Sequence, residues 1–158
     1  MEDSEYITGE QYELLRCLLK HDVEFMLIGA FAVAYHGFPR DSQDLDIFYN
    51  PKKSNVKKLY QALSEFFGEL PEEFPDYNVL LEKNALRFGA GKNTTDLLNT
   101  ISGVTYEEAN QSTNRWQHKN IELKVIGRKA LIKNKHSSDR PKDTLDALEL
   151  KKIEKMND

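Results

Sequence analysis

The stretch "IGAFAVAYHGFPRDSQDLDIF", residues 28 to 48, begins with a glycine turn and ends with two aspartates one residue apart. Its last part, "DLDIF", alternates polar and apolar residues, which predicts a β-strand. Asp44 and Asp46 therefore stand at positions i and i+2 of one strand, and their side chains point to the same face. With a rise of about 3.3–3.4 Å per residue, their Cα atoms are roughly 6.5–7 Å apart. Two carboxylates at this spacing can converge on one hard cation or on a pair of cations.

Two unpaired carboxylates side by side repel each other, and one of them tends to stay protonated unless a cation neutralises the pair. Mg²⁺ prefers oxygen ligands and commonly binds one or two carboxylates together with the phosphates of a substrate. Asp44 and Asp46 therefore predict a platform for Mg²⁺, with Mn²⁺ as the alternative ion, that serves phosphoryl or nucleotidyl transfer. The competing interpretation is a half-exposed edge strand with two solvated acids, and an isolated Asp-x-Asp pair favours it.

A glycine turn that precedes Asp44 by 15 residues changes that balance. Gly29 and Ala30 stand at the junction between a buried strand, "VEFMLIG", and a short alanine-rich helix, "AFAVAYHG". Small residues at such a junction let backbone N–H groups approach a phosphate closely. A tight turn without a ligand is the alternative for Gly29 alone, but the turn and the acid pair together favour a nucleotide site.

The rest of the chain predicts an α/β (α+β) fold. Thr8 and Gln11 fit a capping box before a helix from about Gly9 to Lys20, and Ser54 is expected to cap another helix. The segments "ALRFGAG" and "TTDLLNTI" predict two strands joined by a Gly-Lys-Asn turn, and "RWQHKNIELKVIG" predicts a hairpin. Residues 79 to 83 fit either a helix or a strand. The order of elements predicts a mixed β-sheet flanked by helices, with a C-terminal helical segment.

Composition limits the class of protein. The chain has 158 residues, which fits a single domain over residues 1–158. Its net charge of −4, from 22 basic and 26 acidic residues, disfavours a surface that coats nucleic acid broadly. Cys17 is the only cysteine, and its apolar surroundings, "LLRCLL", predict a buried small hydrophobe. No run is long enough to span a membrane and the N-terminus is acidic, so we expect a cytoplasmic protein without a membrane partner.

The pattern "IGA" followed by "DLD" resembles the signature of the nucleotidyltransferase superfamily, which has the fold of DNA polymerase β. More narrowly, "GAFAVAYHGFPRDSQDLDIF" is similar to bacterial minimal nucleotidyltransferase-like proteins, and the similarity continues through "DLLNTISGVTYEEA" and "LIKNKHSSDRPKDTLDALEL". The resemblance implies transfer of a nucleotidyl group from a nucleoside triphosphate to an acceptor hydroxyl on a protein, an RNA or a small molecule. Ala30 stands where many catalytically proven members have Ser or Gly, so a hydroxyl contact to phosphate is absent.

The resemblance also implies a third acid on a neighbouring strand, which completes the metal site or activates the acceptor hydroxyl. "NTTDLLN" supplies Asp96 for this role, ahead of Glu107 or Glu82. Arg40 precedes Asp44 by four residues. It is expected to contact phosphate or to orient Asp44, with a plain surface salt bridge as the alternative.

A basic segment, "KNKHSSDRPKD", stands out in this acidic chain. The resemblance implies that Lys135 or Arg140 reaches the triphosphate, whereas a solvated charged surface is the alternative. Asp143 and Asp146 follow on the predicted terminal helix. They are expected either to orient these bases by ion pairing or to favour the first turn of the helix.

Two functions from different classes remain open. In the first, Asp44 and Asp46 hold Mg²⁺, Asp96 assists the metal or acts as a base, and the Gly29–Ala30 backbone cradles phosphate. In the second, the chain is a non-catalytic interaction module of the same fold, for example a component that binds a toxin or antitoxin partner. All three acids are present, which favours metal binding in either case.

Overall fold

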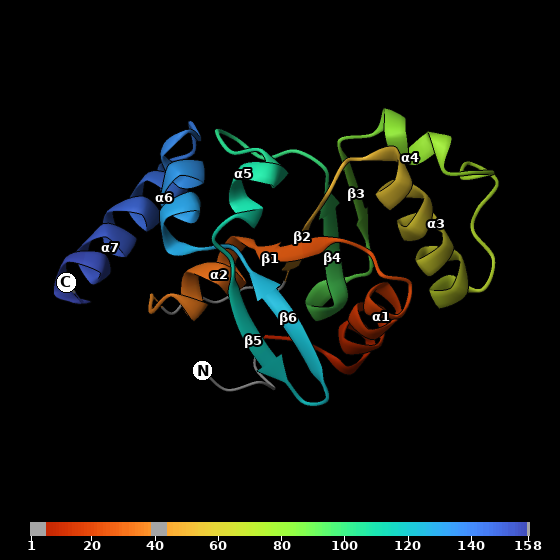
Figure 1. The fold of residues 1–158 in the computed structure, drawn as a ribbon, viewed down its shortest axis with the longest axis horizontal. Coiled ribbons are helices and arrows are strands. Elements are labelled where there is room, and N and C mark those ends of the chain that lie inside the picture. Colours follow the sequence, from red (N-terminus) through yellow and green to blue (C-terminus); the bar gives the residue numbers. More distant parts are fainter. Residues whose placement is uncertain (1–5, 39–43, 158) are drawn as a thin grey trace.

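A computed structural model describes residues 6–38 and 44–157 of the chain. Figure 1 shows strands in the middle of the molecule and helices on both sides of them. The strands are β1 (Phe25–Ile28), β2 (Asp44–Tyr49), β3 (Ala85–Phe88), β4 (Thr94–Leu98), β5 (Asn114–His118) and β6 (Ile121–Val125). The helices are α1 (Gly9–Lys20), α2 (Gly29–Tyr35), α3 (Lys53–Phe67), α4 (Asn78–Glu82), α5 (Tyr106–Asn110), α6 (Arg128–His136) and α7 (Pro141–Asn157).

The strands form one six-stranded sheet in the order β3-β4-β2-β1-β6-β5. The strand β2 lies antiparallel to β1 on one side and parallel to β4 on the other. The strands β1 and β6 are also parallel, whereas β3 and β5 pair antiparallel with β4 and β6. The predicted fold class is confirmed, because the sheet is mixed, helices flank it, and a long helix closes the chain.

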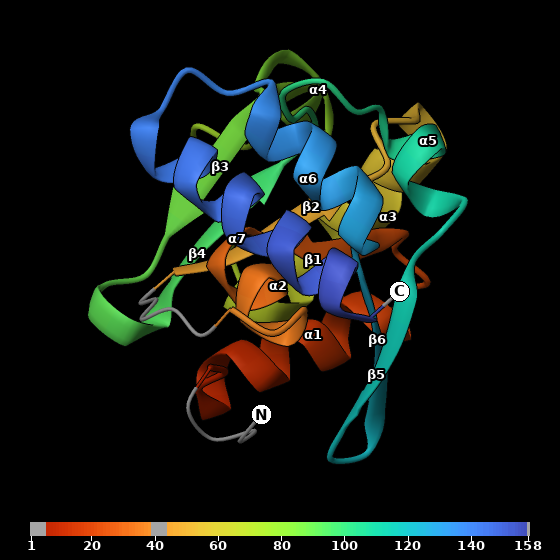
Figure 2. The same cartoon turned by 90° about the vertical axis from the view of Figure 1, so that its left-hand side faces the viewer.

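The helices divide between the two sides of the sheet. Figure 1 shows α1 and α3 towards one side and α6 and α7 towards the other. Viewed from that other side, α6 and α7 lie next to each other in front of the sheet, with α2 close by (Figure 2). Within residues 6–38 and 44–157, no helix combines the length and the apolar character needed to cross a membrane.

Burial along the two central strands follows their side-chain alternation. All four residues of β1 are buried, as expected for a strand covered on both faces. In β2, Leu45 and Ile47 are buried, while Asp44 and Asp46 are only partly buried. The two acids therefore share one face, as the sequence predicts, and the apolar residues between them anchor the strand in the core.

Local predictions had mixed outcomes. The capping box is confirmed, because the Gln11 backbone N–H donates to Thr8 Oγ1 and the Thr8 backbone N–H donates to Gln11 Oε1. The expected Ser54 cap is wrong, since α3 already begins at Lys53. The side chain of Asn55 instead holds this end of α3, by donating to the carbonyl oxygens of Glu24 and Asn50.

The structure resolves one alternative that the sequence left open and contradicts one further prediction. Of residues 79 to 83, for which the sequence left two alternatives, 79 to 82 lie in the short helix α4 and Lys83 is its C-cap. The prediction of a buried Cys17 is wrong, because its side chain is only partly buried. The Cys17 side chain lines a surface pocket between α1 and α3, where its thiol donates a hydrogen bond to the Glu65 carboxylate.

Candidate active site

The sheet register brings the three predicted acids together. Asp46 of β2 and Asp96 of β4 are direct partners in a parallel pair, and Asp44 precedes Asp46 by two residues on the same face. The Asp96 side chain is 15 % exposed and that of Asp44 is 39 % exposed. The three carboxylates consequently form one group that ranges from nearly buried to solvent-accessible.

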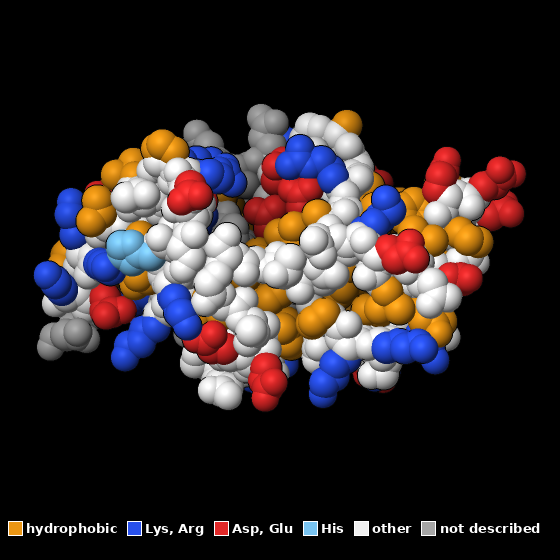
Figure 3. All heavy atoms as spheres, turned by 90° about the horizontal axis from the view of Figure 1, so that it is seen from above, with side chains coloured by type: hydrophobic (Ala, Val, Ile, Leu, Met, Phe, Trp, Pro, Cys, Tyr) orange, Lys and Arg blue, Asp and Glu red, His pale blue; other side chains and the backbone are white. Residues whose placement is uncertain are grey.

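These acids line a pocket of about 190 Å³. Figure 3 shows acidic side chains gathered in a hollow, with basic side chains on either side of it. Arg40, the remaining predicted nucleotide-binding residue, lies outside the described residues. The structure brings together all the other predicted site residues, which line this pocket: Gly29, Ala30, Asp44, Asp46, Asp96, Lys135 and Arg140.

Gly29 is fixed at this place by two constraints. Its φ of +69° lies in the left-handed region, which residues with a Cβ rarely adopt. A Cβ at Gly29 would also overlap the carboxylate of Asp46. The end of β1 and the Asp46 side chain are therefore in contact, and only glycine permits that contact.

The sequence analysis missed Arg87, which comes from β3 at the edge of the sheet. Its Nε lies 2.7 Å from Asp96 Oδ1, and its Nη2 lies 3.0 Å from Asp96 Oδ2 and 3.2 Å from Asp44 Oδ2. Arg87 faces Asp96 directly in the antiparallel pairing of β3 with β4. The sequence could have revealed this contact. Pairing the two predicted strands antiparallel across the Gly-Lys-Asn turn places Arg87 beside Asp96.

Burial and like charges change the protonation of the acid group. Burial raises the pKa of Asp46 to about 7, and a hydrogen bond with Asp96 and the negative charges of Asp96 and Asp44 add to the effect. Asp46 thus keeps its proton up to near neutral pH, as one of several adjacent carboxylates does when no cation compensates their charge. The donor set of three carboxylates fits Mg²⁺ or Mn²⁺, which prefer oxygen ligands.

On the opposite wall, an ion-pair cluster joins α6 to α7. Lys135 Nζ lies 2.9 Å from Asp143 Oδ1 and 3.4 Å from Asp146 Oδ2, and the Lys135 side chain is only 12 % exposed. Ser138 Oγ donates to the other oxygen of Asp143 at 2.6 Å. Burial alone would raise the pKa of Asp143, but the hydrogen bonds from Ser138 and Lys135 outweigh it and lower that pKa.

This cluster answers one question that the sequence left open. Asp143 and Asp146 do pair with the basic segment, and they fix Lys135 at the pocket wall. The Arg140 side chain is 72 % exposed, and its Nε lies as far as 3.9 Å from Asp143 Oδ2, so the guanidinium is held more loosely than the Lys135 ammonium group. Lys142 also lines the pocket.

The balance of charge in the pocket decides which ligands suit it. Among its described lining residues, five are acids and four are bases: Arg87 accompanies the three acids of β2 and β4, whereas Asp143 and Asp146 accompany the bases of the opposite wall. A simple anion would meet the three strand acids, and a simple cation would meet the bases. A ligand that carries both signs of charge, such as a divalent cation with a phosphate chain, fits both walls.

Comparison with known proteins supports the fold. No protein-family model matches the chain, and no curated protein matches its sequence. Among solved structures, the lincosamide antibiotic adenylyltransferase LnuA, with lincomycin bound, is similar at 17 % identity, with 94 % of this chain and 99 % of that chain covered and a TM-score of 0.55. A protein of Thermotoga maritima described as a candidate nucleotidyltransferase matches at 13 % identity over 99 % of this chain and 94 % of its own, with a TM-score of 0.48. The chain has a nucleotidyltransferase-like fold, so the predicted resemblance is confirmed at the level of the fold.

Proposed function

We propose that this protein is a Mg²⁺-dependent nucleotidyltransferase, which moves a nucleotidyl group from a nucleoside triphosphate to an acceptor hydroxyl within a single domain formed by residues 1–158. One observation carries the proposal: Asp44, Asp46 and Asp96 converge in a pocket whose other wall carries the bases Lys135, Arg140 and Lys142. The acceptor is a protein, an RNA or a small molecule. The similar adenylyltransferase LnuA acts on a lincosamide antibiotic, which makes a small alcohol the first acceptor to test.

In this proposal Asp44 and Asp46 hold the metal ion. When bound, Mg²⁺ supplies charge neutralisation at the phosphates and at the developing oxyanions. Asp96 adjoins Asp46 in the sheet, and it assists metal binding or accepts the proton of the attacking hydroxyl. Asp46 can become a metal ligand near neutral pH, because its pKa of about 7 lets its carboxyl group lose the proton there.

The phosphate chain is bound from two sides in this proposal. The Gly29–Ala30 backbone approaches it from beside Asp46, and Ala30 contributes no hydroxyl, so its contact is through the main chain. Lys135 and Arg140 face it from the wall formed by α6 and the start of α7. Arg140 is the more available of the two, because Lys135 is already paired with Asp143 and Asp146. Arg40 remains a further candidate from the sequence.

The test is a transfer assay with labelled nucleoside triphosphates, Mg²⁺ or Mn²⁺, and a panel of small alcohols, RNA ends and proteins. The double variant Asp44→Asn/Asp46→Asn should lose transfer by several orders of magnitude, because metal charge stabilisation disappears. Glu107→Gln is the matched control, since Glu107 is an exposed acid outside the pocket. Equal transfer by the wild type and the double variant would contradict the proposal.

A non-catalytic interaction module is the second candidate, and the Arg87 contacts favour it. Arg87 bridges Asp96 and Asp44, so part of the acid charge is compensated by the protein itself. In this case the wild type would bind Mg²⁺ and a triphosphate, or a toxin or antitoxin partner, and transfer nothing. Thermal unfolding with and without Mg²⁺ and triphosphate, run beside the transfer assay, separates binding from turnover.

A further inference from the structure

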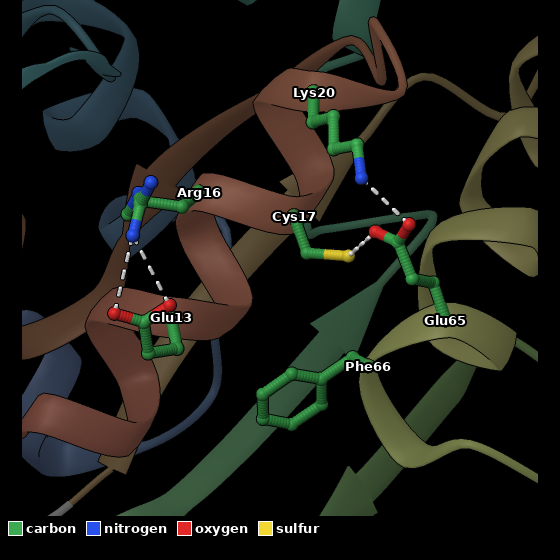
Figure 4. A pocket seen from close by; sticks show the side chains of 6 residues that line it. All are labelled: Glu13, Arg16, Cys17, Lys20, Glu65 and Phe66. Atoms are coloured by element: carbon green, nitrogen blue, oxygen red, sulfur yellow. Dashed lines mark hydrogen bonds and ion pairs between the residues drawn. The ribbon is translucent and has the colours of Figure 1, made fainter.

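A second cluster of side chains with metal-binding atoms lies where the ends of α1 and α3 meet. Cys17 and His21 are four residues apart, in the last turn of α1 and at its C-cap, and Glu65 lies in the last turn of α3. Residues at this spacing lie on the same side of a helix. Figure 4 shows the Cys17 and Lys20 side chains directed across the gap towards the Glu65 carboxylate.

The donor atoms of this cluster are close together. Cys17 Sγ donates a hydrogen bond to Glu65 Oε2 at 3.0 Å, and His21 Nε2 lies 3.3 Å from the same oxygen. One ligand atom from each of the three residues lies within 4.8 Å of the other two. In a tetrahedral zinc site the bond lengths place donor atoms roughly 3.4–3.6 Å apart. Side-chain shifts of about 1 Å therefore convert this arrangement into zinc geometry.

We propose that Cys17, His21 and Glu65 bind one Zn²⁺ ion, with a water molecule as the fourth ligand. Thiolate and imidazole favour Zn²⁺ over Mg²⁺, whereas the acid pocket on β2 and β4 offers oxygen atoms only. A cavity of about 530 Å³, lined in part by Cys17, Lys20 and Glu65, leaves room for the water. The site is separate from the proposed nucleotidyl transfer, because none of its three residues lines the acid pocket.

Lys20 holds the Glu65 carboxylate in a suitable orientation. Its Nζ lies 2.7 Å from Glu65 Oε1, so that Oε2 is directed at the sulfur and the imidazole. Burial and the neighbouring Glu65 carboxylate raise the pKa of the Cys17 thiol to about 11. Formation of the metal–thiolate bond therefore releases the thiol proton to solvent. The bound ion ties the end of α1 to the end of α3.

Cobalt is the spectroscopic probe for this site. A thiolate bound to Co²⁺ gives a charge-transfer band in the near ultraviolet, whereas carboxylate ligands do not. Because the chain contains one cysteine, such a band reports Cys17 alone. We expect the reduced, full-length protein to develop the band with one equivalent of Co²⁺ per chain, and Zn²⁺ to abolish it by displacement.

Variants assign the ligands. Cys17→Ser should abolish the band, and His21→Gln and Glu65→Gln should each weaken Co²⁺ binding about tenfold or more, the size of effect seen when a metal site loses a supporting group. Glu13→Gln is the matched control, because Glu13 lines the same cavity but pairs with Arg16. Circular dichroism of the metal-free variants checks that each is folded. Zn²⁺ should also raise the unfolding temperature of Asp44→Asn/Asp46→Asn, but not when Cys17→Ser is added.

Three results would overturn this assignment. The first is no thiolate band at one equivalent of Co²⁺. The second is saturation at half an equivalent, which would mean that cysteines of two chains share the ion. The third is wild-type affinity in both His21→Gln and Glu65→Gln, which would mean that Cys17 binds metal without its neighbours.

Discussion

At the residue scale, Gly29 links backbone conformation to the chemistry of the pocket. Its positive φ turns the chain from β1 into α2, and its lack of a Cβ leaves room for the Asp46 carboxylate. Ala30, the next residue, carries a Cβ without a hydroxyl. The turn therefore serves the site through its backbone and through the space it leaves.

Replacement of Gly29 by alanine tests this assignment. We expect Gly29→Ala to destabilise the protein by at least about 1–2 kcal/mol, because a left-handed backbone is unfavourable for residues with a Cβ. The overlap with Asp46 adds to that cost and displaces a proposed metal ligand. Urea unfolding measures the change. Gly9→Ala is the control, because a Cβ at Gly9 meets nothing within 4 Å and should change stability by less than about 0.5 kcal/mol.

At the element scale, the strand β3 contributes Arg87, which lies over the acids of β2 and β4. The guanidinium compensates their charge and competes with any divalent cation for Asp96 and Asp44. The helices α6 and α7 contribute the opposite wall, which Lys135, Asp143 and Asp146 hold together. Each wall of the pocket is thus itself an ion-paired structure.

Removal of the Arg87 charge should strengthen binding of Mg²⁺ or Mn²⁺. We expect Arg87→Gln to raise the affinity for Mn²⁺ severalfold, because one positive charge is lost next to three carboxylates. Isothermal titration calorimetry in the absence of nucleotide measures the effect. Arg115→Gln is the control, since Arg115 forms a comparable exposed pair with Glu122 on β6. Unchanged affinity in Arg87→Gln would mean that the ion binds elsewhere.

The Lys135 cluster should matter for stability as well as for nucleotide binding. Lys135→Met should destabilise the protein by about 3 kcal/mol, because it removes the ammonium group that lies within 3.4 Å of two nearly buried carboxylates, those of Asp143 and Asp146. Adding Asp143→Asn and Asp146→Asn should restore part of that loss. Lys152→Met removes an exposed pair with Glu149 and should cost less than about 1 kcal/mol. Chemical unfolding of the four proteins tests this, and an equal cost for Lys135→Met and Lys152→Met would contradict it.

At the scale of the whole molecule, the sheet gathers residues from distant parts of the chain into one pocket. The crossover between the parallel strands β2 and β4 contains α3, α4 and β3, so Asp46 and Asp96 meet although fifty positions separate them. The chain end then returns through α6 and α7 to close the pocket. Because the pocket gathers charged side chains from several elements, the free energy of unfolding depends on the protonation of those side chains.

This concentration of charge predicts how stability changes with pH. The pKa of Asp46 is about 7 in the folded protein, above the ordinary carboxyl value of about 3.9 in the unfolded chain. The contribution of Asp46 to the free energy of unfolding is fully present below about pH 4 and is lost as the pH rises towards 7. In that range the unfolded chain releases the Asp46 proton, whereas the folded protein retains it. Urea unfolding in the presence of a chelator should show this loss in the wild type. Asp46→Asn should lack it, and an identical pH dependence in both proteins would contradict the assignment.

The sequence by itself determined the acid pair, the glycine turn, the alternation of β2 and the capping box of α1, because these depend on residues close together in the chain. It also indicated the class of fold and pointed to Asp96, although a resemblance rather than spacing selected that residue. The tertiary structure decided the role of Arg87, the pairing of Lys135 with Asp143 and Asp146, and the approach of Cys17 and His21 to Glu65. The physical reason is that strand register and helix packing set distances between residues of different elements, and local periodicity carries no information about which strand or helix becomes the neighbour.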